Sequence, residues 1–317
     1  PDATVVAYDT VSGKLAWTAG NETTGYSSPA LLVVGGREQI VVHSGSAVLG
    51  LEPKSGAVLW RYPYVTDYSC NIATPIAVDG KVFVSSGENH GCALLELKVS
   101  GDAFTVSEVW SSHGVKSVLR NEWQTSILLD GHLYGMDNVG GAGPITHLTC
   151  VHATTGESVW QETRFGKGNL IAADGKLFLS TLKGELIVAR ISPSGYDEIG
   201  RSTVIGSTRQ APALANGLLY LRDNEDIVGL DVRLYDGPPS PSIAARCLER
   251  SAKPVRDVLS MDCTDGRISH THCAASRLRQ LARHDRKHHW AFYSPAHTYG
   301  KLPAENRLWP RRNRVRS

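Results

Sequence analysis

The sequence predicts an all-β fold in which one four-stranded antiparallel unit is repeated over about the first 230 residues. Three observations support this fold: a tryptophan that recurs at similar intervals, a glycine turn shortly before it, and a second hairpin turn earlier in each repeat. The chain has 317 residues, of which 41% are apolar, so it can bury a sizeable core.

The recurring tryptophans are Trp17, Trp60, Trp110 and Trp160, and Gly200 occupies the fifth equivalent position. A short apolar segment and a glycine turn precede several of them, as in Val5–Asp9 followed by Gly13. Glycine suits such a turn because it adopts positive φ without a steric penalty. The pattern predicts a strand, a turn and a second strand whose tryptophan is a structural residue packed in the core.

A second hairpin precedes this one in the full repeats. Its turns are Asp79-Gly80, Asp130-Gly131, Asp174-Gly175 and Asn216-Gly217, each between short apolar runs. Asp-Gly and Asn-Gly favour the type I′ turn, which needs positive φ at both central residues. Four strands in about 45 residues are typical of a β-propeller blade. Complete blades are predicted at 28–60, 74–110, 124–160 and 168–200.

Both ends of the repeat pattern are incomplete blades. Residues 1–17 supply the outer two strands of one blade and residues 210–232 the inner three of another. Both pieces contain the third strand, at Val5–Asp9 and Ile227–Asp231, so they do not merge into one closed blade. Because a propeller closes by pairing its ends, we expect the chain to be a fragment of a larger ring.

The segment from Tyr8 to Trp17, with Asp9 and Gly13-Lys14 inside it, resembles the repeat of the quinoprotein (pyrroloquinoline quinone)-like propeller family. Glu52–Trp60 and His152–Trp160 are weaker copies. The resemblance covers about residues 1–232 and implies that each tryptophan packs on the glycine turn of a neighbouring blade. The family includes alcohol dehydrogenases that carry pyrroloquinoline quinone and Ca²⁺ on the propeller axis. It also includes non-catalytic proteins such as the outer-membrane assembly lipoprotein.

A candidate ligand site lies at the mouth of the axis, where the residues just before each innermost strand come together. These residues are polar or aromatic, a composition that suits a polar or anionic ligand. They are Tyr26, Asn71, Asn121, Glu122, Trp123, Gln124, Lys167, Asn169, Arg209 and Gln210. The alternative is that residues at the mouth of a propeller axis are polar because they are in contact with water, in which case their polarity does not indicate a ligand.

A dehydrogenase of this family would need a carboxylate base and oxygen ligands for Ca²⁺. Glu122 and Asn121, with Asn71 as a third ligand, are the candidates, and the adjacent cysteines that often cover the quinone are absent. We therefore expect a non-catalytic binding or assembly scaffold without cofactor or metal, whose partner is a protein or small polar ligand at the axis. The alternative is an alcohol dehydrogenase using pyrroloquinoline quinone and Ca²⁺.

Charge is divided unevenly along the chain. Residues 1–233 contain 17 Lys and Arg against 24 Asp and Glu, whereas residues 234–317 contain 16 against 7. No apolar run is long enough to span a bilayer. The family resemblance implies a periplasmic or otherwise extracytoplasmic location in a bacterium.

The basic segment 234–317 lacks the repeat pattern and is expected to be a separate tail. Two explanations remain, disorder and a shifted reading frame. Cys263, His270, His272 and Cys273 do not have the spacing usual for zinc. Basic charge alone indicates generic attraction to phosphate, so we expect no specific nucleic-acid binding.

Cysteines and histidines are scattered through the repeats. The odd number of cysteines, Cys70, Cys92 and Cys150, argues against a full disulfide framework. The histidines occur one or two per blade and are expected to be surface groups or hydrogen-bonded core groups. They are His43, His90, His113, His132, His147 and His152.

Overall fold

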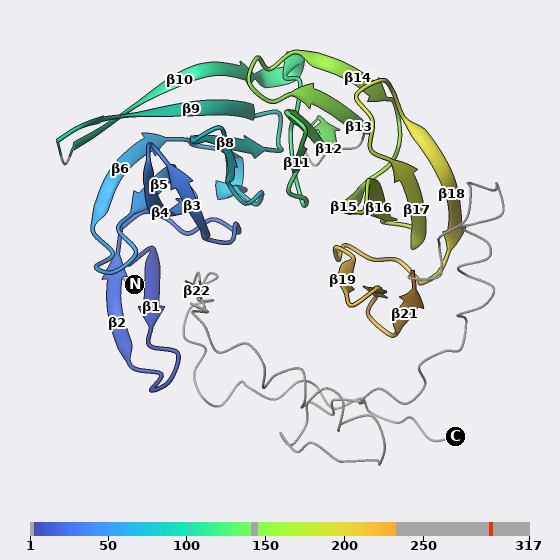
Figure 1. Cartoon of the computed structure of the whole chain (residues 1–317), viewed down its shortest axis with the longest axis horizontal. Helices are drawn as coiled ribbons and strands as arrows, with labels where there is room; N and C mark the ends of the chain where they lie inside the picture. The colour runs from blue at the N-terminus through green and yellow to red at the C-terminus, as the bar shows by residue number, and fades with distance from the viewer. Residues whose placement is uncertain (1–2, 102, 141–144, 233–291, 294–317) are drawn as a thin grey trace, which may run out of the picture.

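The computed structural model describes residues 3–101, 103–140, 145–232 and 292–293. Apart from two short 3-10 turns, the regular secondary structure of this part is β-strand, in sheets that follow one another along an arc (Figure 1). We call these sheets blades 1 to 6 in chain order. The predicted all-β propeller is confirmed, whereas the tail prediction for 234–317 lies outside the described residues except for a two-residue strand.

Blades 2 to 5 have four strands each, in sequence order, which confirms the four complete blades. Blade 2 contains β3 (Ala30–Val34), β4 (Arg37–His43), β5 (Ala47–Leu51) and β6 (Val58–Pro63). Blade 3 contains β7 (Ile76–Val78), β8 (Lys81–Ser86), β9 (Gly91–Ser100) and β10 (Ala103–His113). Blade 4 contains β11 (Ile127–Leu129), β12 (His132–Val139), β13 (Ile145–His152) and β14 (Ser158–Glu162). Blade 5 contains β15 (Gly168–Ala173), β16 (Lys176–Thr181), β17 (Glu185–Arg190) and β18 (Asp197–Thr203).

The two end blades have the predicted outer and inner strands. Blade 1 contains β1 (Val5–Tyr8) and β2 (Leu15–Ala19), with β22 (Phe292–Tyr293) paired to β1. Blade 6 contains β19 (Ala213–Ala215), β20 (Leu218–Arg222) and β21 (Ile227–Asp231). Short 3-10 turns, η1 (Asp67–Ser69) and η2 (Gly114–Lys116), lie in the loops after β6 and β10.

The turns between first and second strands have the backbone that the sequence predicts. Both central residues of all four Asp-Gly and Asn-Gly turns have positive φ, for example 47° at Asp130 and 73° at Gly131. Blade 2 uses Gly35-Gly36 at the same place, with φ of 56° and 75°. These tight turns connect the innermost strand of each of these blades directly to its second strand.

A β-bulge lies at the tryptophan position of each blade that has both outer strands. The residues paired across these strands are Ala7 and Trp17, Gly50 and Trp60, Leu94 and Trp110, Cys150 and Trp160, and Val188 and Gly200. Gly200 thus has the fifth equivalent position, as predicted. A bulge bends and twists the strand and so changes the direction of the following side chain.

Three of the tryptophans link their blade to the next one. The Nε1 atoms of Trp17, Trp110 and Trp160 donate hydrogen bonds to the carbonyls of Pro53 (3.2 Å), Ala153 (3.1 Å) and Ser192 (2.9 Å). Each carbonyl belongs to the loop between the third and fourth strands of the following blade. The packing of these tryptophans on a neighbouring blade is thereby confirmed.

Trp60 is the exception. Its Nε1 donates to Oε1 of Gln39 in its own blade at 2.6 Å, and its ring lies over Gly50 of that blade. The next blade has an unusually long outer hairpin of 10 and 11 residues, which extends past β6 (Figure 1).

The hydrophobic core is divided into layers between blades. Each of the five clusters of buried residues combines side chains from two successive blades, from blades 1 and 2 through to blades 5 and 6. Between blades 2 and 3, for example, Val48 and Trp60 pack with Val82 and Leu95. Stability therefore depends on contacts between neighbouring blades, as expected for a repeat architecture.

Two further features concern the described part of the chain as a whole. Cys70, Cys92 and Cys150 are free thiols. Among the described residues, no helix has the length and apolar character needed to cross a membrane.

Gly156→Ala is expected to destabilise the protein more than Gly131→Ala. Both residues lie in blade 4 turns with φ near 75° (76° and 73°), so both variants incur the left-handed backbone penalty of about 1–2 kcal/mol. A methyl group at Gly156 would also lie 2.6 Å from the Trp110 ring, whereas nothing lies within 4 Å at Gly131. The clash adds about 1–3 kcal/mol. Urea unfolding measures the difference, and equal losses would contradict a tryptophan contact that contributes to stability.

Candidate functional site

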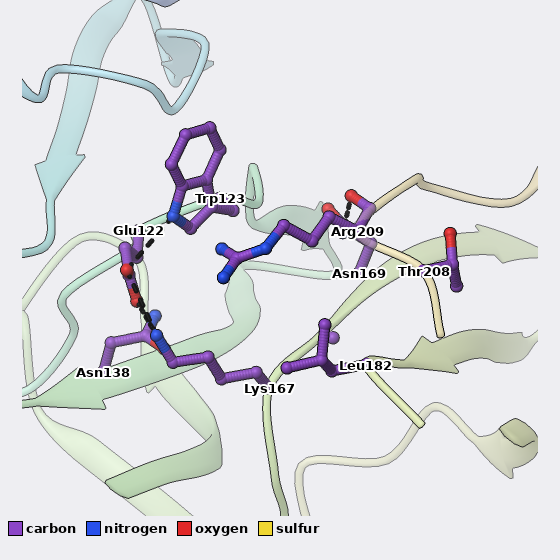
Figure 2. Close-up of a pocket in the computed structure, with 9 residues that line it drawn as sticks. Glu122, Trp123, Asn138, Lys167, Asn169, Leu182, Thr208 and Arg209 are labelled. Carbon is purple, nitrogen blue, oxygen red and sulfur yellow. Dashed lines mark hydrogen bonds and ion pairs between the residues drawn. The ribbon is translucent and has the colours of Figure 1, made fainter. Parts of the chain in front are cut away.

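A pocket opens between blades 4, 5 and 6 on the face where the loops enter the innermost strands (Figure 2). Five of the ten predicted site residues line it: Glu122, Trp123, Lys167, Asn169 and Arg209. The sequence did not indicate the other lining residues, which are Asn138, Gly168, Leu182 and Thr208. Asn138 lies within β12, Leu182 follows β16 and Thr208 lies in a loop, so no motif marked them.

The carboxylate of Glu122 is held on two sides. Lys167 Nζ lies 3.0 and 3.2 Å from its two oxygens, and the indole Nε1 of Trp123 donates to Oε1 at 3.1 Å. The Glu122 side chain is buried and that of Lys167 is about one-quarter exposed. The ion pair joins the loop before β11 to the loop before β15 and neutralises the carboxylate.

Trp123 is the centre of an aromatic and cationic row across the mouth. The guanidinium carbon of Arg209 lies 5.5 Å from the centroid of its ring, a cation–π arrangement, and the Tyr26 ring lies 6.4 Å away at 54°. Figure 2 shows the Arg209 side chain extending toward Trp123. These three side chains come from the loops before β3, β11 and β19, so the row connects alternate blades. Trp123 remains 45% exposed and Tyr26 51%.

The loop that carries Arg209 is fixed by its neighbours. Asn169 Nδ2 donates to the carbonyl of Arg209 at 2.9 Å, and Thr208 Oγ1 donates to the carbonyl of Arg222 at 2.6 Å. Gln210 is exposed and does not line the pocket; its carbonyl accepts a bond from Ser180. Side-chain hydrogen bonds to backbone carbonyls therefore hold the loop, and the guanidinium of Arg209 stays available to a ligand.

Asn71 is a buried residue whose hydrogen bonds stabilise the loops that form the mouth. Its Nδ2 donates to the carbonyls of Ser44 (2.7 Å) and Tyr64 (3.2 Å), and its Oδ1 accepts from the hydroxyls of Thr66 and Ser86. Its carbonyl accepts the backbone N–H of Tyr26 at 2.8 Å. The fully buried amide thus positions Tyr26 and has no oxygen lone pair directed at the mouth.

Asn121 and Gln124 are also internal. Asn121 Nδ2 donates to Gln124 Oε1 and to the carbonyl of Met136, both at 3.1 Å, and Asn121 Oδ1 accepts from Ser126. Gln124 Oε1 also accepts the backbone N–H of Met136 at 2.6 Å, while its buried Nε2 has no hydrogen-bond partner among the described residues. These amides shape the loop that presents Glu122 and Trp123.

An ion pair that no sequence motif predicted also holds this loop. Arg120 forms a bidentate pair with Asp137 of β12, with Nε–Oδ1 and Nη2–Oδ2 distances of 2.7 Å. The backbone N–H of Arg120 adds a bond of 2.9 Å to Asp137, and Nη1 donates to the carbonyl of Val115 at 2.8 Å. The side chains are 4% and 1% exposed. The pair fixes the start of the segment 120–124.

Pyrroloquinoline quinone and Ca²⁺ are the cofactors that the quinoprotein resemblance implies, and the candidate ligand residues do not fit Ca²⁺. Ca²⁺ takes six to eight oxygen ligands. The side-chain oxygens of Asn71 and Asn121 are occupied by hydroxyl donors inside the protein, and Glu122 is paired with Lys167. No three His, Cys, Asp or Glu side chains in the described ranges are grouped to hold a metal ion.

Asp137→Asn is expected to destabilise the protein by about 3–5 kcal/mol, because it leaves the buried Arg120 guanidinium without its counter-charge. The matched control is Asp197→Asn, which removes the ion pair with Arg190 between side chains that are 44% and 55% exposed. That change should cost less than about 1 kcal/mol. Chemical unfolding of both variants tests the buried ion pair, and similar small losses would show that it is not needed.

Comparison with known proteins places the chain in a family. The model of a family described as outer membrane protein assembly factor BamB matches residues 1–162. A search of curated proteins found no significant match.

Solved structures with similar architecture include BamB of Moraxella catarrhalis, 15% identical over 69% of this chain and 76% of that one, with a TM-score of 0.42. Quinohemoprotein alcohol dehydrogenases of Pseudomonas putida (14% identical, TM-score 0.48) and Comamonas testosteroni (13%, 0.47) match 69% and 71% of this chain. The matches span 42% and 49% of those two chains. The family match covers just over half of the sequence, and the chain belongs to the family of the outer membrane protein assembly factor BamB.

Proposed function

We propose that this protein is a non-catalytic binding and assembly scaffold, and that its partner, a protein segment, binds at the axial mouth. The observation that supports this most is the state of Glu122, the single carboxylate among the described pocket-lining residues. Lys167 and Trp123 already hold it, while Arg209 and the exposed face of Trp123 remain open. The side chains at the mouth are therefore suited to binding a partner rather than to abstracting a proton from a substrate.

The chemistry of the mouth favours a protein partner that carries a carboxylate beside apolar groups. Trp, Tyr and Arg dominate the energetics of protein interfaces, and all three occur in the row Tyr26, Trp123 and Arg209. No described residue accepts a hydrogen bond from the Arg209 guanidinium, which can grip a carboxylate with two parallel bonds. A small anionic ligand is the competing occupant.

We further propose that the protein acts outside the cytoplasm of a bacterium. The name of the matching family refers to assembly of outer membrane proteins, and the match covers residues 1–162. This assignment rests on the family alone.

The second candidate function, an alcohol dehydrogenase using pyrroloquinoline quinone, is separated from the scaffold by one experiment. We expect that incubation with micromolar quinone and Ca²⁺, followed by desalting, leaves no bound quinone spectrum and no dye reduction with alcohols. The reason is that Asn71, Asn121 and Glu122 are engaged in internal bonds. Saturable quinone binding that is lost in Arg209→Ala would instead support the enzyme.

Photo-crosslinking tests the mouth as the partner surface. A photoreactive amino acid at position 123 is expected to form an adduct with one discrete protein in the host cell envelope, because Trp123 lies in the open row. The control position is Val159 on the outer strand β14 of the same blade, which is similarly exposed at 41% against 45%. Adducts of equal yield at both positions, or at neither, would contradict the proposal.

A further inference from the structure

Four rings form a continuous row between blades 2 and 3. The centroids of His43 and Tyr64 lie 4.8 Å apart, those of Tyr64 and His90 4.3 Å, and those of His90 and His113 5.4 Å. His43 ends β4 and Tyr64 follows β6 in blade 2, whereas His90 precedes β9 and His113 ends β10 in blade 3. We call these four residues the histidine row. It corrects the expectation that the histidines are isolated.

Burial increases along the histidine row from the surface to the interior. His113 is exposed, His90 is half-buried, and Tyr64 and His43 are buried. Neither ring nitrogen of His43 has a hydrogen-bond partner in the described part of the chain, which corrects the expectation that core histidines are hydrogen-bonded. A proton added to this ring would bring a charge into an interior where the backbone of Ala73 is the one group acting on His43 that favours it.

The groups that face the row offer little compensation for such a charge. The titratable groups that interact electrostatically with one another or with the rings of the histidine row are Tyr62, Tyr64, Asp67, Cys92 and Glu108. Asp67 opposes the lowering of the His90 pKa, and Glu108 lies near His113 but is bonded to the hydroxyl of Tyr62. His43 itself is influenced by the backbone of Ala73 and by His90, which repels a charge on it. The acids thus lie toward the outer end and none acts on His43.

The inner end of the row supports the axial mouth. A methyl group at Gly25 would lie 2.8 Å from the carbonyl oxygen of His43 and 2.9 Å from that of Asn71. The backbone that enters the mouth at Gly25 is therefore packed closely against the backbone of both residues. Asn71 in turn bonds the carbonyls of Ser44 and Tyr64 and holds the N–H of Tyr26. Displacing His43 or Tyr64 therefore moves the support of Tyr26.

We propose that the histidine row is an acid-sensitive contact between blades 2 and 3, which opens when its imidazoles are protonated and releases the Asn71 support of the axial mouth. The consequence for partner binding rests on the proposed function. The opening itself does not, so it can be tested without a partner.

The direction of the pH effect follows from the pKa values. Burial lowers the pKa of His43 from 6.5 to about 3; the backbone of Ala73 opposes this shift, and repulsion from His90 adds a smaller lowering. Burial and His113 lower that of His90. The opened state therefore binds more protons, so the contact is fully stable above pH 6.5 and weakens as the pH falls toward 3. For His43 alone the opening equilibrium should rise by about 30-fold from pH 8 to pH 5.

Hydrogen exchange of the full chain tests this opening, with rates corrected for the intrinsic effect of pH. Protection of segments 64–75 and 86–92 is expected to fall by about 30-fold or more between pH 8 and pH 5. The β16–β17 turn of blade 5, which contains no histidine, is expected to keep its protection. An equal loss in all three segments would indicate general acid unfolding and overturn the proposal.

Two variants assign the effect to the row. His43→Leu removes the buried imidazole and should remove most of the pH dependence in both segments. His132→Gln is the control, because His132 and His152 also pack ring to ring, at 5.3 Å, but within blade 4. It should leave the pH dependence unchanged. Persistence of the full effect in His43→Leu would overturn the proposal.

A measurement on the unaltered protein covers the case in which His43→Leu does not fold. In an NMR titration of the ¹⁵N-histidine-labelled chain, one imidazole should remain neutral down to the pH at which segments 64–75 open. If every imidazole titrates near pH 6.5 while the fold persists, the buried neutral His43 does not exist and the proposal fails.

Discussion

The contacts of Trp17, Trp110 and Trp160 with the next blade are the constraint on which the rest of the structure depends. Every hydrophobic cluster combines residues of two blades, so no blade buries its apolar surfaces alone. The indole covers apolar surface of the neighbouring turn, and its N–H satisfies a carbonyl that the turn leaves unpaired, as between Trp160 and Ser192. The β-bulge before the tryptophan aims the ring, and the pitch of the repeat places a carbonyl where the N–H can reach it.

The axial mouth is a consequence of this stacking. Tight turns join the innermost strands to the second strands, and the loops that enter the innermost strands converge from successive blades. Within this frame the functional side chains depend on a small number of buried polar contacts. Arg120 and Asp137 hold the loop of Trp123, and Asn71 holds the backbone of Tyr26. A row assembled from three alternate blades is sensitive to the relative position of every blade between them.

The blade pattern could be predicted from the sequence because each signal is local. An Asp-Gly pair such as Asp130-Gly131 needs its φ angles whatever surrounds it, and Trp17 follows its glycine turn by a few residues. The site was only partly predictable. Position before an innermost strand does not reveal whether an amide faces the mouth or the interior. Asn71 faces the interior because an acceptor from blade 2, the Ser44 carbonyl, and a donor from blade 3, the Ser86 hydroxyl, meet there. The pair of Arg120 with Asp137 depends on tertiary approach across 17 residues and has no sequence signal.

The interface between blades 2 and 3 differs from its neighbours in a way that explains why a polar row occurs there. Trp60 turns back to Gln39, so this interface has no hydrogen bond from a tryptophan to the next blade. Its nearest substitute is the Tyr64 hydroxyl, which donates to the carbonyl of Gly91 at 2.7 Å and lies between two imidazoles. An indole N–H carries no charge at any physiological pH, whereas imidazoles gain one as the pH falls. Where a blade lacks the tryptophan hydrogen bond to the next blade, the contact between the two blades therefore depends on imidazoles, whose charge changes with pH.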